Sequence, residues 1–471
     1  MNARFSAARI AVAFVAVVLL ISSSKAPGQT STASSSTGLA GVGIDASRLV
    51  KFFVDEKGVA QRVAVGDPRG QLSLAKLNAA KRMLPPGLDK KSSLRKISLN
   101  RLERALEGVL AGGGRIPEEM RYLAGLSRIQ YVFFYPDSGD IVLAGPAEGW
   151  FVDLTGRTVG VDSGRPALLL EDLVVALRAY GPGKTEGPMI GCSIDPTQEG
   201  LANMQQFLAS INPSPDDAQF IVDGLHKAMG LQTVRVLGVS PNTHLAQVMV
   251  EADYRMKLIG IGLEHTGIRQ FITYVDKATP TGSNGLQRWY FVPDYECVRV
   301  SEDHEAMEMV GDGVKLVGEN EFVGADGQRT KSGSSNRASM AFTSSFTKFY
   351  SEIARRSPVY AQLRDIVDMA VAAAFIQHEG YYAKAGWDME LLGDESRFPV
   401  EVYRAPTQVD TVVTSIWKGR RLMTPVAGGV HVEAELALKS ENLLEDTEGK
   451  VEKVRKETQL DHLQPGQWWW D

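Results

Sequence analysis

The densest group of side chains suited to chemistry lies between residues 244 and 265. A histidine can act as a general base near neutral pH when a carboxylate lies beside it. His244 and Asp253 are therefore the candidate catalytic pair, with Asp294 or Glu296, from a turn after a predicted strand, as further carboxylates. The charged and titratable residues of the group are His244, Glu251, Asp253, Arg255, Lys257, Glu264 and His265.

The same residues also have an interpretation without any active site. Glu251 precedes Arg255 by four positions, and Asp253 precedes Lys257 by four. Acid-before-base pairs at this spacing stabilise an exposed helix by about 0.2–0.5 kcal/mol each. Arg255 and Lys257 are therefore either ligand-binding residues or the basic members of two surface ion pairs. Asp294 likewise has a structural alternative, because acidic residues after a strand are often turn formers.

A single helix must position these residues. Residues 237–264 read LGVSPNTHLAQVMVEADYRMKLIGIGLE, and Asn242 or Thr243 can cap the start of the helix through a side-chain oxygen. Gly260 and Gly262 mark the end, because glycine tolerates the positive φ found there. The apolar positions at helical spacing are Leu245, Val248, Met249, Ala252, Met256 and Ile259.

Short catalytic and metal-binding motifs give little support for any one reaction. The sequence has no G-x-S-x-G, H-E-x-x-H, Walker A or EF-hand pattern. Three Ser-x-x-Lys pairs occur, but the other motifs of penicillin-recognising enzymes stand in the wrong order around them. Neither a metal site nor a cofactor is predicted.

The N-terminus has the pattern of a signal peptide. Arg4 and Arg9 precede a twelve-residue apolar run at positions 10–21, which is shorter than the roughly 20 residues of a membrane span. Small residues before Gln29 favour cleavage after Gly28. The sequence thus predicts export to the periplasm, cell envelope or exterior, with no transmembrane span after cleavage; an uncleaved anchor is the alternative.

Composition and patterning predict an α+β protein with two domains. Hydrophobic residues make up 44% and charged residues 23%, which is typical of globular chains, and the net charge of −5 argues against a nucleic-acid-binding surface. Short hairpins, one of them around the Gly311-Asp312-Gly313 turn, indicate mostly antiparallel sheets with packed helices. The predicted divisions are a signal peptide (1–28), a flexible linker (29–47), an N-terminal α+β domain (48–183), a larger α+β domain (189–438) and a charged tail (439–471).

The two cysteines admit two interpretations. In an oxidising compartment Cys192 and Cys297 could form a disulfide, which would close a loop of roughly 100 residues. The alternative is two buried free thiols, since cysteine is among the most buried residue types.

The chain ends in Trp468, Trp469, Trp470 and Asp471. These tryptophans either pack back onto the body, form an exposed aromatic anchor for a partner or polysaccharide, or lie at a membrane interface. Packing onto the body is the favoured interpretation, and the anchor makes them candidate binding residues.

Four segments carry a family resemblance: YVFFYPDSGDIVLAGPAEGW, VSPNTHLAQVMVEADYRMKLIGIGLE, RWYFVPDYECVRV and the closing WWWD. Together they resemble a family of secreted planctomycete proteins that is defined by a domain of unknown function. The resemblance covers the chain from about Phe52 to Asp471. It implies secretion but transfers no activity and no catalytic residue.

The leading functional hypothesis is a non-catalytic envelope or periplasmic protein that binds or scaffolds an unidentified protein or envelope component. The alternative is a hydrolase with an acid–base site at His244 and Asp253. An enzyme should have a deep pocket with converging titratable groups, whereas a scaffold should have flat apolar patches or a shallow groove.

Overall fold

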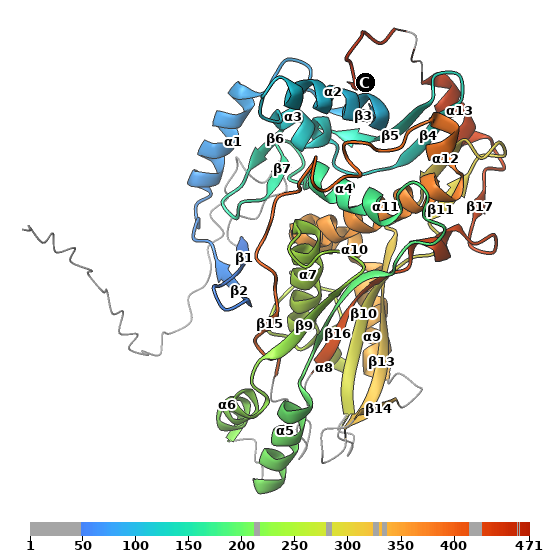
Figure 1. Cartoon of the computed structure of the whole chain (residues 1–471). Helices are drawn as coiled ribbons and strands as arrows, with labels where there is room; N and C mark the ends of the chain where they lie inside the picture. Colours follow the sequence, from blue (N-terminus) through green and yellow to red (C-terminus); the bar gives the residue numbers. More distant parts are fainter. Residues whose placement is uncertain are drawn as a thin grey trace, which may run out of the picture. The chain divides into compact units, whose positions relative to one another are not determined.

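The computed structural model describes residues 49–211, 217–278, 285–323, 329–331, 337–413, 426–458, 460 and 462–471 (Figure 1). These residues belong to one compact unit. The predicted signal peptide and linker lie outside the described residues. Among the residues described, no helix is long and apolar enough to cross a membrane.

Nine strands form the larger sheet. Its central strands are β8 (Ile190–Asp195), β16 (Val426–Val432) and β10 (Gly285–Pro293), and β16 runs parallel to β10 and antiparallel to β8. The strand order is β1 (Val50–Val54), β2 (Val59–Ala64), β15 (Gln408–Val409), β9 (Gln232–Leu237), β8, β16, β10, β13 (Val314–Val323) and β14 (Arg329–Lys331).

A seven-stranded sheet stands beside it, and a two-stranded ribbon pairs β6 (Trp150–Val152) with β7 (Thr158–Gly160). The order of the seven strands is β17 (Leu444–Glu445), β11 (Val298–Val300), β12 (Ala306–Met309), β4 (Tyr131–Tyr135), β5 (Asp140–Ala147), β3 (Ser92–Ser98) and β18 (Trp469–Trp470). Most strand pairs are antiparallel, which confirms the predicted α+β class with mainly antiparallel sheets.

Both sheets contain strands from each side of the division predicted at residues 183–189. β1 and β2 join the sheet built around β8, while β11 and β12 join the sheet built around β4 and β5. The predicted division therefore does not coincide with a division between the sheets.

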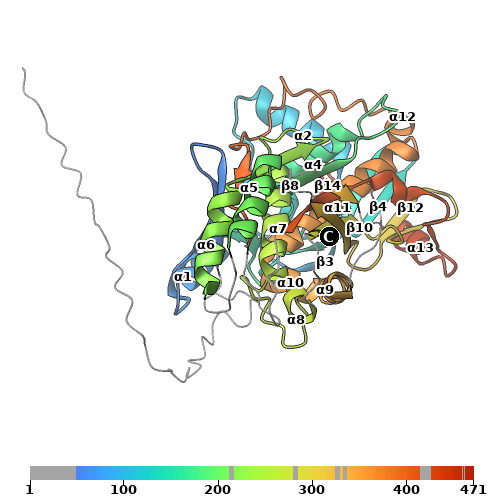
Figure 2. The same ribbon diagram turned by 90° about the horizontal axis from the view of Figure 1, so that it is seen from below.

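The helices pack around and between these sheets. α7 (His244–Gly260) packs on β8, β16 and β10, and α11 (Pro358–His378) contacts both α7 and α4 (Leu170–Ala179). α5 (Gln198–Ser210) and α6 (Ala218–Met229) lie side by side in both views (Figures 1 and 2). The other helices are α1 (Gln71–Met83), α2 (Leu99–Ala111), α3 (Glu118–Arg121), α8 (Tyr274–Lys277), α9 (Arg337–Lys348), α10 (Tyr350–Arg356), α12 (Tyr381–Ala385) and α13 (Lys450–Glu457), with 3-10 turns at Leu123–Gly125 and Ala434–Leu438.

The predicted helix at residues 243–260 is present, but its charged face is buried. Thr243 caps it by accepting a hydrogen bond from the Ala246 amide (3.2 Å), and the helix ends at Gly260. Asp253 and Lys257 are both fully buried, because one side of α7 lies on the larger sheet and another against α11. The expectation of two surface ion pairs was therefore wrong.

The C-terminal segment is also part of the fold rather than an exposed tail. Trp469 and Trp470 form β18 on the edge of β3, and Trp468 and Trp470 are only 5% and 4% exposed. The carboxylate of Asp471 accepts two hydrogen bonds from the Arg95 guanidinium (2.8 and 3.0 Å). These contacts match the packed-back interpretation and exclude Trp468 and Trp470 as an exposed anchor.

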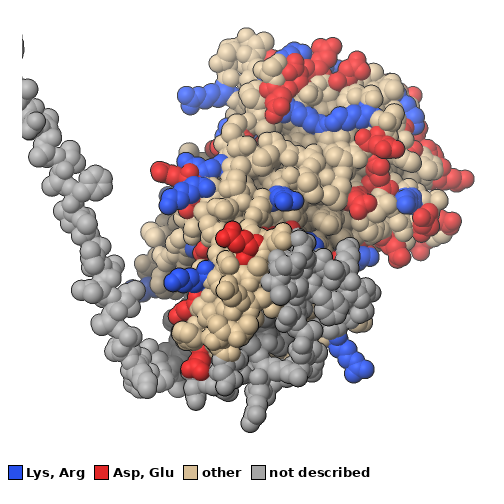
Figure 3. Space-filling view, turned by 60° about the horizontal axis from the view of Figure 1, so that its bottom comes forward, with Lys and Arg blue, Asp and Glu red and all other residues tan. Residues whose placement is uncertain are grey.

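Charge is distributed without strong segregation on the face shown in Figure 3, where acidic and basic side chains are interleaved and uncharged residues cover much of the surface. This arrangement agrees with the small net charge of the chain, −5 over 471 residues.

Candidate functional site

His244 lines a cavity of about 400 Å³, but Asp253 does not. Asp253 lies farther along α7, where its carboxylate accepts a hydrogen bond from Lys257 (2.9 Å), and the Lys257 amine also donates to the Ile194 carbonyl of β8 (3.1 Å). The structure therefore separates the predicted catalytic pair. It also removes Lys257 as a ligand-binding residue, because its side chain is 0% exposed.

The other predicted carboxylates lie away from this cavity. Asp294 is about half exposed and pairs with Lys315 (3.3 Å), as a turn residue would. Glu296 is exposed and does not line the cavity. Arg255 is buried between Glu251 and Glu264, so it too is a structural residue rather than a candidate for direct ligand binding.

Cys192 and Cys297 are free and buried. Burial raises the pKa of both thiols, which disfavours the reactive thiolate. Of the two interpretations of these cysteines, the structure has the pair of buried free thiols.

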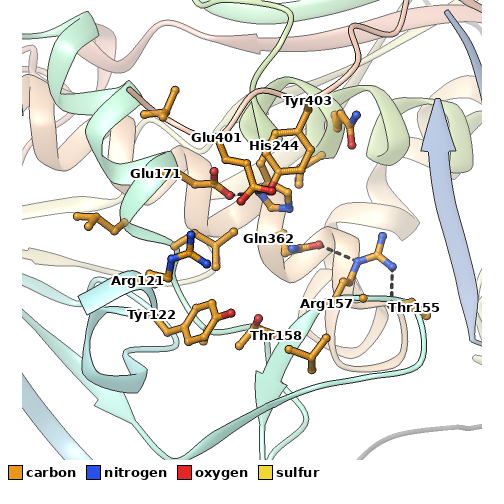
Figure 4. Close-up of a pocket in the computed structure, with 18 of the residues that line it drawn as sticks. Arg121, Tyr122, Thr155, Arg157, Thr158, Glu171, His244, Gln362, Glu401 and Tyr403 are labelled. Carbon is orange, nitrogen blue, oxygen red and sulfur yellow. Dashed lines mark hydrogen bonds between the residues drawn. The ribbon is translucent and has the colours of Figure 1, made fainter. Parts of the chain in front are cut away.

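The cavity lies where several elements meet. Its walls come from α3 and the residue after it, the β6–β7 ribbon, the first turns of α4 and α7, α11, and an irregular strap at residues 398–403 (Figure 4). Two aromatic side chains of the strap, Phe398 and Tyr403, line it. Its polar lining residues include Arg121, Tyr122, Thr155, Arg157, Thr158, Glu171, His244, Gln247, Glu251, Gln362, Glu401 and Tyr403.

His244 is oriented by a carboxylate that sequence reasoning missed. Nδ1 of His244 lies 2.7 Å from Oδ2 of Asp172, and the His244 side chain is 16% exposed. Burial alone would lower the pKa of His244, but the negative charge of Asp172 and this hydrogen bond outweigh it, so the pKa is raised above its ordinary value. The second oxygen of Asp172, Oδ1, is buried and has no hydrogen-bond partner among the described residues.

Glu171 precedes Asp172 in the first turn of α4 and faces the same cavity. Burial, followed by the charge of Asp172, raises the pKa of Glu171 to about 7. The Tyr403 hydroxyl donates a hydrogen bond to Oε1 of Glu171 (2.8 Å), and the Tyr403 and His244 rings lie 5.6 Å apart. The position near a helix N-terminus favours carboxylates there, so both acids also have a purely structural reason to occur.

Hydrogen bonds to backbone atoms of Tyr403 and Arg404 tie the strap to the start of α7. The Tyr403 amide donates to the Asn242 carbonyl (2.8 Å), and the Asn242 side-chain amide donates to the Tyr403 carbonyl (2.9 Å). Gln247 adds a hydrogen bond to the Arg404 carbonyl (3.0 Å). These bonds hold Tyr403 beside His244 and Glu171.

Arg157 forms the opposite wall and is fully engaged. Its Nε donates to Oε1 of Gln362 (2.9 Å) and its Nη1 donates to Thr155 (3.2 Å) (Figure 4). The guanidinium also pairs with Glu251. Glu251 pairs in turn with Arg255 (3.1 Å). The charged residues of α7 therefore support the wall of the cavity from behind.

The arrangement offers one acid and one base in a concave, partly desolvated site. The pKa of Glu171 is raised to about 7, the pKa of His244 is raised above its ordinary value, and Asp172 orients the imidazole. No group of three or more His, Cys, Asp or Glu side chains in the described part of the chain is arranged to hold a metal ion.

Comparisons with other proteins leave the reaction open. No curated protein and no solved structure matches the chain. Residues 192–273, which include most of β8, all of β9 and α7 with His244, match the model of a family described as "Protein of unknown function (DUF1598)".

Proposed function

We propose that the protein is an exported hydrolase that acts on a small polar substrate by acid–base chemistry in this cavity. The observation that carries the proposal is the 2.7 Å contact of Asp172 with Nδ1 of His244 at the cavity wall, beside Glu171. Because Asp172 occupies Nδ1, Nε2 is the nitrogen of His244 that can exchange a proton with a water or substrate.

Glu171 and His244 supply the two proton-transfer roles. Burial raises the pKa of Glu171 to about 7, so near neutral pH this carboxyl can give or take a proton, and Nε2 of His244 takes the complementary role. The base takes a proton from the attacking water as its oxygen bonds to the substrate. The acid gives its proton to the leaving group, and the proton taken from water restores the pair.

The cavity favours an enzyme over the scaffold hypothesis. A scaffold would bind through flat apolar patches, whereas converging titratable groups with shifted pKa values in a pocket are typical of active sites. The proposed catalytic histidine is the one predicted from sequence. Asp172 and Glu171 take the roles first given to Asp253 and to Asp294 or Glu296.

The activity test uses chromogenic p-nitrophenyl esters, phosphates and glycosides as probes. His244→Asn keeps a donor near the Nδ1 position but removes Nε2, and it should lower the rate on the hydrolysed class by about 10²–10⁴-fold. His265→Asn is the matched control, since His265 is exposed and does not line the cavity. If no class is hydrolysed faster by the wild type than by His244→Asn, the catalytic proposal is wrong.

Export is proposed from the apolar run at positions 10–21 and from the resemblance to secreted proteins. Expression of the full chain in a bacterium, followed by fractionation and intact-mass measurement, should give a periplasmic or secreted product that begins at Gln29. A cytoplasmic product of full length would contradict it.

A further inference from the structure

We infer that the ligand of this cavity carries a carboxylate or phosphate group, and that Arg121, with Tyr122 and Thr158, binds this anionic group. The inference rests on the proposed function only in taking this cavity as the ligand site. It does not require His244 to be catalytic.

Arg121 is a cation without a partner. It is the last residue of α3, its side chain is exposed and it lines the cavity. Within the described ranges its guanidinium makes neither an ion pair nor a hydrogen bond, although Glu118 and Glu119 belong to the same short helix. Arg157, by contrast, donates hydrogen bonds to Gln362 and Thr155 and pairs with Glu251.

The hydroxyls of Tyr122 and Thr158, near Arg121, are also available to a ligand. Tyr122 is held by an edge-to-face contact with Trp150 (ring centroids 5.7 Å apart), and its hydroxyl faces the cavity near Thr158 (Figure 4). Neither hydroxyl has a hydrogen-bond partner in the part of the chain that the structure describes. Thr158 is only 9% exposed, so its hydroxyl has little access to bulk water.

Gln362 supplies an independent indication of a ligand. Its side chain is more than nine-tenths buried and lines the cavity. Because Arg157 can only donate, the Gln362 oxygen must face Arg157, and the amide nitrogen then faces the cavity (Figure 4). That nitrogen has no acceptor among the described residues and is open to the cavity, where an acceptor on a ligand can pair with it.

Two of the three carboxylates that line the cavity, Glu171 and Glu401, lie near Tyr403. Glu401 is close enough to raise the pKa of both Glu171 and Tyr403, which places its charge on the Tyr403 side of the cavity. The third lining carboxylate, Glu251, is paired with Arg157 and Arg255, which leaves Arg121, Tyr122 and Thr158 as donors for a ligand. An acceptor-rich anion fits these donors, because guanidinium and hydroxyl donors form charge-assisted hydrogen bonds with it.

The test measures binding of inorganic phosphate and of malonate to the full chain by calorimetry. We expect one of the two anions to bind, and which one binds distinguishes a phosphate from a carboxylate ligand. Arg121→Gln should weaken that binding about tenfold or more, as expected for a lost charge-assisted hydrogen bond. Tyr122→Phe, which keeps the ring on Trp150, should weaken it less.

A matched control separates the outcomes. Arg82→Gln removes an exposed arginine of α1 that does not line the cavity, and this variant should bind the anion like the wild type. Binding of neither anion, or equal binding by Arg121→Gln and Arg82→Gln, would overturn the inference. Anion binding that depends on Arg121 in a chain without hydrolytic activity would overturn only the proposed function.

Discussion

Asp253 and Lys257 form an ion pair in which neither side chain is exposed. Burial raises the pKa of Asp253 to about 6 even though Lys257 acts against this shift. Taking two charges out of water is costly, and removing one partner leaves the other uncompensated. The pair is therefore a structural element, and its role can be tested separately from the cavity.

Lys257→Met should destabilise the fold by about 3 kcal/mol, because it leaves Asp253 buried without its cation. Replacing both residues, as in Asp253→Leu with Lys257→Met, should recover much of this loss. Urea denaturation of the two variants and the wild type measures the difference. A single variant as stable as the wild type would show that the pair is not buried as described.

Of the two residues in the His244–Asp172 contact, the sequence identified only His244. His244 was found because a histidine at a helix start among carboxylates is visible in the sequence. Its partner was not, because Asp172 lies 72 positions away and spacing along a chain does not reveal such contacts. Asp253 looked closer only because it shares the helix.

At the scale of elements, local signals predicted α7 and its cap but not the partners of the strands. The Gly311-Asp312-Gly313 turn is present, yet β12 and β13 on its two sides join different sheets, so no hairpin forms. Within β16, a Cβ on Gly428 would lie 1.9 Å from the Trp289 carbonyl oxygen, so the strand needs glycine for close approach to β10. Such contacts between distant segments are set by packing rather than by periodicity.

The C-terminal strand gives a prediction for an element. Trp470→Ala should lower the free energy of unfolding by about 3 kcal/mol, as for other buried tryptophans. Val402→Ala is the control, because Val402 is 77% exposed. Thermal or urea unfolding compares the two, and equal stabilities would contradict the docking of β18 on β3.

For the whole molecule, the sequence predicted a division at residues 183–189, but strands from both sides of it share the two sheets. Pairing between strands more than 150 residues apart leaves no local signal in the sequence.

The packing of these layers buries several acids. Burial raises the pKa of Asp365 to about 7, as it does for Glu171, while bonds to Arg101 and Ser98 outweigh burial and lower the pKa of Asp140.

These shifts predict how stability depends on pH. Asp365 and Glu171 stay protonated in the folded state at pH values where the unfolded chain has lost the protons, so stability should fall as pH rises from about 5 to 8. Acids with lowered pKa values, such as Asp140, lose their contribution only below about pH 4. Urea denaturation at pH 5 and pH 8 should therefore differ by about 1.4 kcal/mol or more, the value of one pKa unit. Glu171→Gln should reduce the difference, and greater stability at pH 8 would contradict the prediction.

We propose that Glu171 and His244, oriented by Asp172, form the acid and the base of a hydrolytic site. The most direct measurement is the pH dependence of kcat/KM, for the probe that is hydrolysed, in the wild type and in Glu171→Gln. We expect a bell-shaped profile with one limb near pH 7 in the wild type, and loss of that limb together with most of the activity in the variant. A wild-type profile without a limb near pH 7, or the same profile in both proteins, would contradict the claim.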